Sequence, residues 1–128
     1  MEKKCILLAT LFLLTGCPGS GDRMVPRTAT TVVIKNSAVC AVSIMKPGEK
    51  MTGAVIYSKD HDPIFKRFYN HPLYIEQGAC LPLFDATFNA GTRYSITWEV
   101  NAVDKGLHLI TADFTLASES QGNISLAQ

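Results

Sequence analysis

The densest group of potential metal ligands or proton-transfer residues is Asp60, His61 and Asp62. Carboxylate and imidazole groups together suit zinc or copper. Adjacent residues on an extended chain cannot all point at one ion, however, and Pro63 marks the segment as a turn. We therefore interpret it as a solvated loop, and the alternative is a metal site or an enzyme that acts through His61.

Other catalytic signatures are absent from the sequence. It has no H-E-x-x-H zinc motif, no phosphate-binding loop and no nucleophile elbow. The remaining histidines, His71 and His108, are interpreted as surface residues. We predict that the protein is not an enzyme and that it has no catalytic residue, metal, cofactor or small-molecule substrate.

Residues 1–16 have the pattern of a removable export signal. Lys3 and Lys4 give a positive start, and residues 5–14 form an apolar run. Ten residues of helix rise about 15 Å, half of a hydrocarbon core, so this run is too short to span a bilayer. A charged start, a short apolar middle and small residues near the end are typical of a secretory signal peptide.

The next feature is the sequence Leu-Thr-Gly-Cys at residues 14–17, which resembles the lipobox of bacterial lipoproteins. The resemblance implies cleavage before Cys17 and attachment of diacylglycerol to its sulfur. Several acyl chains hold a protein at a membrane far longer than one chain does. Pro18, where an aspartate is absent, implies export to the outer membrane. We expect an anchor on the periplasmic face of a membrane; the alternative is an ordinary signal peptide followed by an unrelated cysteine.

The rest of the chain divides into three parts. Residues 17–28 comprise the lipidated cysteine and a tether, because residues 18–28 hold two glycines, two prolines and a serine without apolar periodicity. Residues 29–116 are predicted to form the folded domain. Residues 117–128 form a polar tail, which is either a last strand or loose.

The charge balance argues against nucleic acid as a partner. The 12 basic and 11 acidic residues of the whole chain fall to ten of each when Lys3, Lys4 and Glu2 leave with the leader. Binding to nucleic acid depends mainly on neutralising phosphates, which a chain without net charge does poorly.

Two cysteines remain for the folded domain. Cys5 leaves with the leader and Cys17 is lipidated, so Cys40 and Cys80 are left in an oxidising compartment, where they most simply pair. Closing a loop of this length contributes about 4 kcal/mol to stability. A metal site or redox pair is the alternative, but there is no C-x-x-C motif and no histidine at ligand spacing.

Alternating apolar and polar residues predict strands rather than helices. Residues 94–100 and 108–116 each alternate, with Leu109 the one apolar residue on the outward side, and a turn at residues 104–106 joins them into a hairpin. Trp98 lies on the apolar face of the first and is expected in the core. Further strands are predicted at residues 30–35, 39–45, 54–58, 64–69 and 73–76, with a turn at residues 46–49.

About seven short strands separated by turns indicate an all-β fold, a single antiparallel β-sandwich of the immunoglobulin type with one disulfide. Gly91 in a turn shortly before Tyr94 resembles the tyrosine corner of such sandwiches, in which the hydroxyl is tied to an upstream backbone group. The alternative is that Tyr94 is an ordinary aromatic residue of the core.

Aromatic and charged residues are mixed between residues 56 and 84. Aromatic side chains and arginine are enriched at protein interfaces. We predict that Tyr57, Arg67 and Tyr69 contact a protein partner. Phe84, and whichever of Phe65 and Phe68 points inward, are assigned to the core.

Five segments together resemble a family of short Gram-negative lipoproteins, described as immunity proteins of type VI secretion: residues 14–19 (LTGCPG), 46–49 (KPGE), 56–58 (IYS), 80–82 (CLP) and 88–94 (FNAGTRY). The resemblance extends to about residue 116. It implies a membrane-tethered domain that captures a toxin arriving in the periplasm. The alternative is a structural or assembly lipoprotein of the envelope or of a secretion apparatus.

Overall fold

The computed structural model describes residues 25–59, 61–118 and 124–127, and these residues form strands, turns and loops without a helix. The all-β prediction is confirmed. The strands are β1 (Arg27–Ala29), β2 (Val32–Lys35), β3 (Ala38–Ala41), β4 (Lys50–Ser58), β5 (Ile64–Arg67), β6 (Arg93–Ala102), β7 (Gly106–Ser118) and β8 (Ile124–Leu126).

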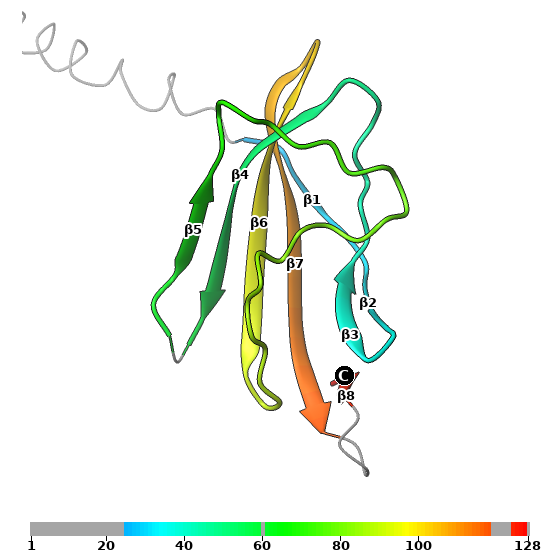
Figure 1. Ribbon diagram of the computed structural model, residues 1–128, viewed down its shortest axis with the longest axis vertical. Helices are drawn as coiled ribbons and strands as arrows, with labels where there is room; N and C mark the ends of the chain where they lie inside the picture. Colours follow the sequence, from blue (N-terminus) through cyan, green and yellow to red (C-terminus); the bar gives the residue numbers. More distant parts are fainter. Residues whose placement is uncertain (1–24, 60, 119–123, 128) are drawn as a thin grey trace, which may run out of the picture.

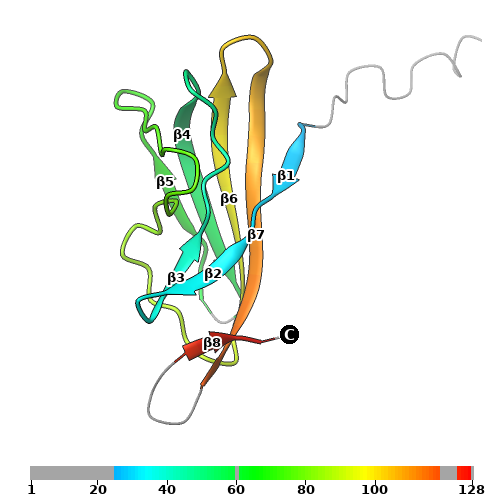
Figure 2. The same ribbon diagram turned by 90° about the vertical axis from the view of Figure 1, so that its right-hand side faces the viewer.

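The strands form a large sheet and a small one. The large sheet has the order β1-β7-β6-β4-β5, with β8 also paired to β7, and the small sheet consists of β2 and β3. The side view shows the small sheet and the loop between β5 and β6 on one side of the large sheet (Figure 2). The other face of the large sheet is therefore free of these segments.

One strand pair departs from the predicted antiparallel arrangement. β1 runs parallel to β7, with Arg27 opposite Leu109, whereas the other strand pairs are antiparallel. The backbone of β1 fills the edge of β7 that the β6–β7 hairpin leaves open, and the chain then continues into the small sheet (Figure 1). Arg27 and Thr28, assigned from sequence to the tether, are thus residues of the sheet.

The β6–β7 hairpin supplies about half of the buried core, as its alternation predicts. The apolar residues on the inward face of both strands are buried, and Trp98 is fully inaccessible. Its indole N–H donates a 3.0 Å hydrogen bond to the carbonyl of Pro82, in the loop that covers the sheet. The predicted core position of Trp98 is confirmed. The buried residues of the hairpin are Tyr94, Ile96, Trp98, Val100, Ile110, Ala112, Phe114 and Leu116.

Cys40 and Cys80 form the predicted disulfide, with their Cα atoms 5.1 Å apart. The bond joins β3 to the loop between β5 and β6. Backbone pairing supports it on both sides, because Val42 bridges Cys80 and the N–H of Leu81 donates to the carbonyl of Ala41 at 2.7 Å. The loop that covers the core is thus fixed to the small sheet.

Tyr94 satisfies both of the interpretations offered from sequence. Its ring is buried and packs edge-on against Phe88, with centroids 4.8 Å apart. Its hydroxyl accepts a 2.5 Å hydrogen bond from the backbone N–H of Asn89, five residues upstream. The tie closes the turn before β6.

Four predicted strands are shorter than expected or missing; among them, β2 begins at Val32 and not at residue 30, and β5 ends at Arg67 and not at residue 69. The prediction of a strand at residues 73–76 is wrong, because only Leu73 bridges a strand residue, Met51. The N–H of Ile75 instead donates to the sulfur of Met45 at 3.5 Å, and its carbonyl accepts from the hydroxyl of Ser43 at 2.7 Å. Side chains take the place of a neighbouring strand here. β3 ends at Ala41 and does not continue to Met45, because beyond it Val42 forms only an isolated bridge with Cys80 and the N–H of Ser43 donates to the carbonyl of Ala79.

Candidate protein-binding face

The face of β4 and β5 that points away from the small sheet carries exposed aromatic residues. Ala54 and Ile56 are buried, so Val55 and Tyr57, which alternate with them, lie on the opposite face. The register places Phe65 opposite Val55 and Arg67 opposite Gly53. Side chains from two adjacent strands therefore gather on one outer surface.

Tyr57 and Phe65 form an aromatic pair on this surface. Their ring centroids are 6.3 Å apart and the ring planes are nearly perpendicular, the edge-to-face arrangement that aromatic rings prefer. They remain 44% and 57% exposed. Two large apolar side chains are thus held in place by each other and by the sheet, yet stay open to a partner.

Arg67 extends the surface toward Tyr69. Its Nη1 donates to the hydroxyl of Tyr69 at 3.0 Å and lies 3.3 Å from both carboxylate oxygens of Glu99. The hydrogen bond to Tyr69, and then that to Glu99, raises the pKa of Arg67 above its ordinary value. Tyr69 is 60% exposed. We call the surface formed by Tyr57, Phe65, Arg67 and Tyr69 the aromatic–arginine face.

A glycine makes room for the Arg67–Glu99 pair. Gly53 lies on β4 between these residues, opposite Arg67 on one side and Glu99 on the other. A Cβ atom at Gly53 would be 3.0 Å from Oε2 of Glu99 and 3.1 Å from the carbonyl oxygen of Lys66. The carboxylate can therefore cross β4 because no side chain stands in its path.

The three residues predicted to contact a partner, Tyr57, Arg67 and Tyr69, thus lie on one surface. Sequence reasoning missed Phe65, although its spacing of two from Arg67 on one strand places both on the same side. Phe68 is the phenylalanine that points inward, where it packs against Phe84 with centroids 5.7 Å apart.

The acidic loop that follows β4 is only partly described. His61 and Asp62 are exposed, and both line a hollow with Ile64 and Asn89. Asp60 lies outside the described residues, as does the predicted lipidation site, Cys17.

Within the described residues, histidine, cysteine and acidic side chains form no cluster of three suited to a metal ion. The same part of the chain has no helix with the length and apolar character that crossing a membrane requires.

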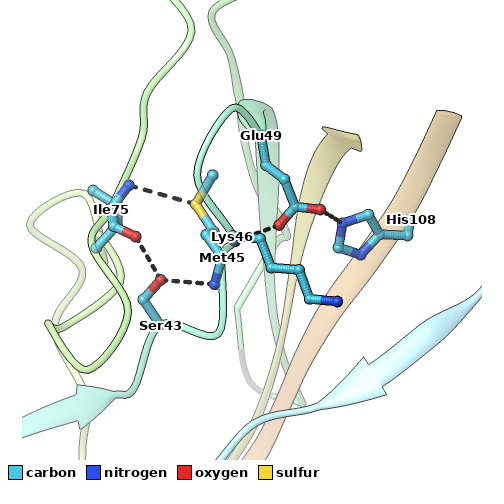
Figure 3. Close-up of polar contacts among 6 residues, drawn as sticks. All are labelled: Ser43, Met45, Lys46, Glu49, Ile75 and His108. Atoms are coloured by element: carbon cyan, nitrogen blue, oxygen red, sulfur yellow. Dashed lines mark hydrogen bonds and ion pairs between the residues drawn. The ribbon is translucent and has the colours of Figure 1, made fainter. Parts of the chain in front are cut away.

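His108 differs from the surface residue expected from sequence. Its Nε2 lies 2.7 Å from Oε2 of Glu49, and its side chain is only 23% exposed (Figure 3). The second carboxylate oxygen of Glu49 accepts a 2.7 Å hydrogen bond from the backbone N–H of Lys46. The pair fastens the turn at residues 46–49 to the start of β7.

Comparison with known proteins places the domain in a family. No curated protein and no solved structure matches the chain. Residues 27–119 match a family described as a domain of unknown function, DUF7480. The match begins at the first residue of β1 and extends through the whole of β7. The chain therefore belongs to the DUF7480 family.

Proposed function

We propose that this chain is a lipid-anchored immunity protein of the bacterial periplasm, which binds a toxin delivered by type VI secretion and neutralises it by occlusion. The proposed fold is an immunoglobulin-like β-sandwich. The two-sheet arrangement and the tie between Tyr94 and Asn89 support that assignment. The observation that carries the proposed function is the aromatic–arginine face.

The composition of this face suits protein recognition. Tyrosine and arginine are over-represented among the residues that dominate binding energy in protein interfaces. Tyr57 and Phe65 brace each other, and Arg67 is held by Tyr69 and Glu99. Side chains that are already ordered lose less conformational entropy on binding, so such a face can bind tightly with a modest contact area.

The compartment is inferred from sulfur chemistry. A disulfide between Cys40 and Cys80 persists in an oxidising environment such as the periplasm. The leader and the lipobox-like residues before Cys17 supply the route of export and the anchor. A domain held at the membrane in this way meets a toxin as soon as it enters the periplasm.

A protection assay tests the function. Cells that lack the gene should be killed by sister cells with an active type VI secretion system, and the wild-type gene should restore survival. The double variant Tyr57→Ala, Arg67→Ala should not protect, because it removes two anchors of the face. Tyr74→Ala is the matched control: it has the same 44% exposure as Tyr57 but lies in the loop between β5 and β6.

Two results would contradict the proposal. If deletion leaves killing by sister cells unchanged, the protein is not an immunity protein. If crosslinking captures a stable envelope complex in unchallenged cells, and the double variant still protects, the assembly role is favoured instead. Mass spectrometry of the full-length product tests the anchor separately, since lipidation must add the mass of a diacylglycerol at Cys17.

A further inference from the structure

One end of the domain brings together three segments that are far apart in sequence. The chain enters β1 beside β7, where the carbonyl of Pro26 accepts a 2.8 Å hydrogen bond from Leu109. The tip of the β6–β7 hairpin lies against the turn at residues 46–49. A Cβ atom added to Gly48 would be only 3.3 Å from Cγ2 of Val103. Pro26, Lys46 and Lys105 line one hollow. We call this the anchor end, since the described chain begins there, just before β1 (Figures 1 and 2).

Positive charge is concentrated at the anchor end. Lys46 lies in the turn, Lys50 begins β4, Lys105 is at the hairpin tip, and Arg27 begins β1; all four are exposed. Asp104 is an acidic residue of the tip. Glu49 is also acidic, but its carboxylate is buried against His108 and the N–H of Lys46. It therefore offsets the positive charge of the surface less than Asp104 does.

Exposed apolar residues accompany these cations. Val103, at the hairpin tip, is 78% exposed, more than any other large apolar side chain in the described residues. Leu107 and Val25 are 40% and 37% exposed, and both lie beside the tip, at the start of β7 and just before β1. Apolar side chains surrounded by lysine and arginine are typical of surfaces that rest in the headgroup region of an anionic membrane.

We propose that the anchor end docks on the anionic phospholipid surface that carries the Cys17 anchor, with Val103 inserted and Lys46 and Lys105 contacting lipid phosphates. The inference rests on the proposed lipidation. Nine residues, the number from Cys17 to Val25, can span at most about 30 Å even at full extension. The anchor therefore keeps this end of the domain close to the headgroups.

Docking at this end would orient the aromatic–arginine face. Lys50 begins β4 at the anchor end, and Tyr57 lies seven residues further along the same strand, about 23 Å away. Phe65 pairs with β4 two residues before Tyr57. The sheet would then stand upright on the membrane, with the face on its side accessible to an incoming protein.

Sedimentation with vesicles tests the proposal. The chain starting at Pro18 retains every described contact and carries no lipid. It should bind vesicles of phosphatidylglycerol and phosphatidylcholine in equal parts and not vesicles of phosphatidylcholine alone. Removing Lys46 and Lys105 by substitution with alanine should weaken binding about fivefold each, and so about 25-fold together. The matched control, Lys35→Ala with Lys59→Ala, removes two exposed charges at the ends of β2 and β4 away from the anchor end.

A fluorescence-quenching experiment tests which end of the domain faces the membrane. The native Trp98 is fully buried, so a tryptophan placed at the tip by Val103→Trp reports lipid contact separately. Its emission should be quenched by bromine-labelled lipid in the anionic vesicles. Ser118→Trp, at the far end of β7, should not be quenched.

Several results would overturn the proposal: no binding of wild type to anionic vesicles, equal weakening by both pairs of lysine substitutions, or equal quenching at Val103→Trp and Ser118→Trp. Both assays lack toxin and lipidation. They can therefore fail while the wild-type gene still protects cells, and they can succeed when it does not.

Discussion

Arg67 and Glu99 form an ion pair although they lie on strands that are not neighbours. Arg67 belongs to β5 and Glu99 to β6, and β4 runs between them. The 3.3 Å contact passes over Gly53, the residue of β4 that is in register with both. The pair thus joins three strands on the outer surface, and its existence depends on the absence of a side chain at one position.

Gly53→Ala should disrupt this arrangement. The added methyl group would meet the carboxylate of Glu99 at 3.0 Å and the backbone oxygen of Lys66 at 3.1 Å. Overpacking of this kind typically costs about 1–3 kcal/mol, which exceeds the small gain in strand propensity from alanine. Urea denaturation should show a lower free energy of unfolding, and β5 should exchange its amide hydrogens faster.

A second substitution separates the two clashes. Glu99→Ala alone should cost less than about 1 kcal/mol, because an exposed ion pair contributes little. In the Glu99→Ala background, the cost of Gly53→Ala should fall if the carboxylate is the main obstacle. An unchanged cost would mean that Gly53→Ala destabilises the protein through its clash with the backbone of Lys66, and that the ion pair plays no part in this loss.

The disulfide should be the largest single contribution to stability. Replacing Cys40 and Cys80 together with serine should lower the free energy of unfolding by about 4 kcal/mol, because the unfolded chain loses a closed loop of about 40 residues. Thermal unfolding with and without a reductant checks the same effect, because breaking the disulfide should lower the melting temperature. Similar melting temperatures in both conditions would contradict this prediction.

Sequence patterns predicted the parts of the fold that local chemistry determines. Alternation of apolar and polar residues located β6 and β7, and the burial of Trp98 followed from it. Alternation does not specify which strands become neighbours, so the parallel pairing of β1 with β7 was not foreseen. Residues 73–76 have strand-like composition, but the hydroxyl of Ser43 takes the place of a strand partner there.

The candidate face shows the same division. Tyr57, Arg67 and Tyr69 were identified by residue type, because aromatic residues and arginine suit interfaces. Glu99 could not be connected with Arg67 from sequence, since the contact depends on the register of three strands and on Gly53. Long-range contacts between side chains follow from topology, which short sequence motifs do not encode.

Tyr94→Phe should show how much the hydrogen bond that closes the turn before β6 contributes to the free energy of unfolding. The substitution removes one oxygen atom and leaves the ring in the core, but the N–H of Asn89 loses its acceptor. An unsatisfied donor costs about 1–3 kcal/mol when it stays away from water. Tyr69→Phe is the control: its hydroxyl contacts Arg67 on an exposed surface, so the free energy of unfolding should change by less than about 0.5 kcal/mol. Equal effects would contradict a specific tie at Tyr94.

Glu49→Ala should loosen the turn at residues 46–49. The buried carboxylate accepts from the N–H of Lys46 and contacts His108, so its removal leaves both groups without their partner. We expect a loss of about 1–3 kcal/mol in the free energy of unfolding, measured by urea denaturation. Glu76→Ala provides the comparison, because Glu76 is exposed and should matter little. Glu49→Gln should recover part of the loss, since the amide oxygen can still accept from the N–H of Lys46. If Glu49→Gln is as unstable as Glu49→Ala, the loss of stability comes from the contact with His108.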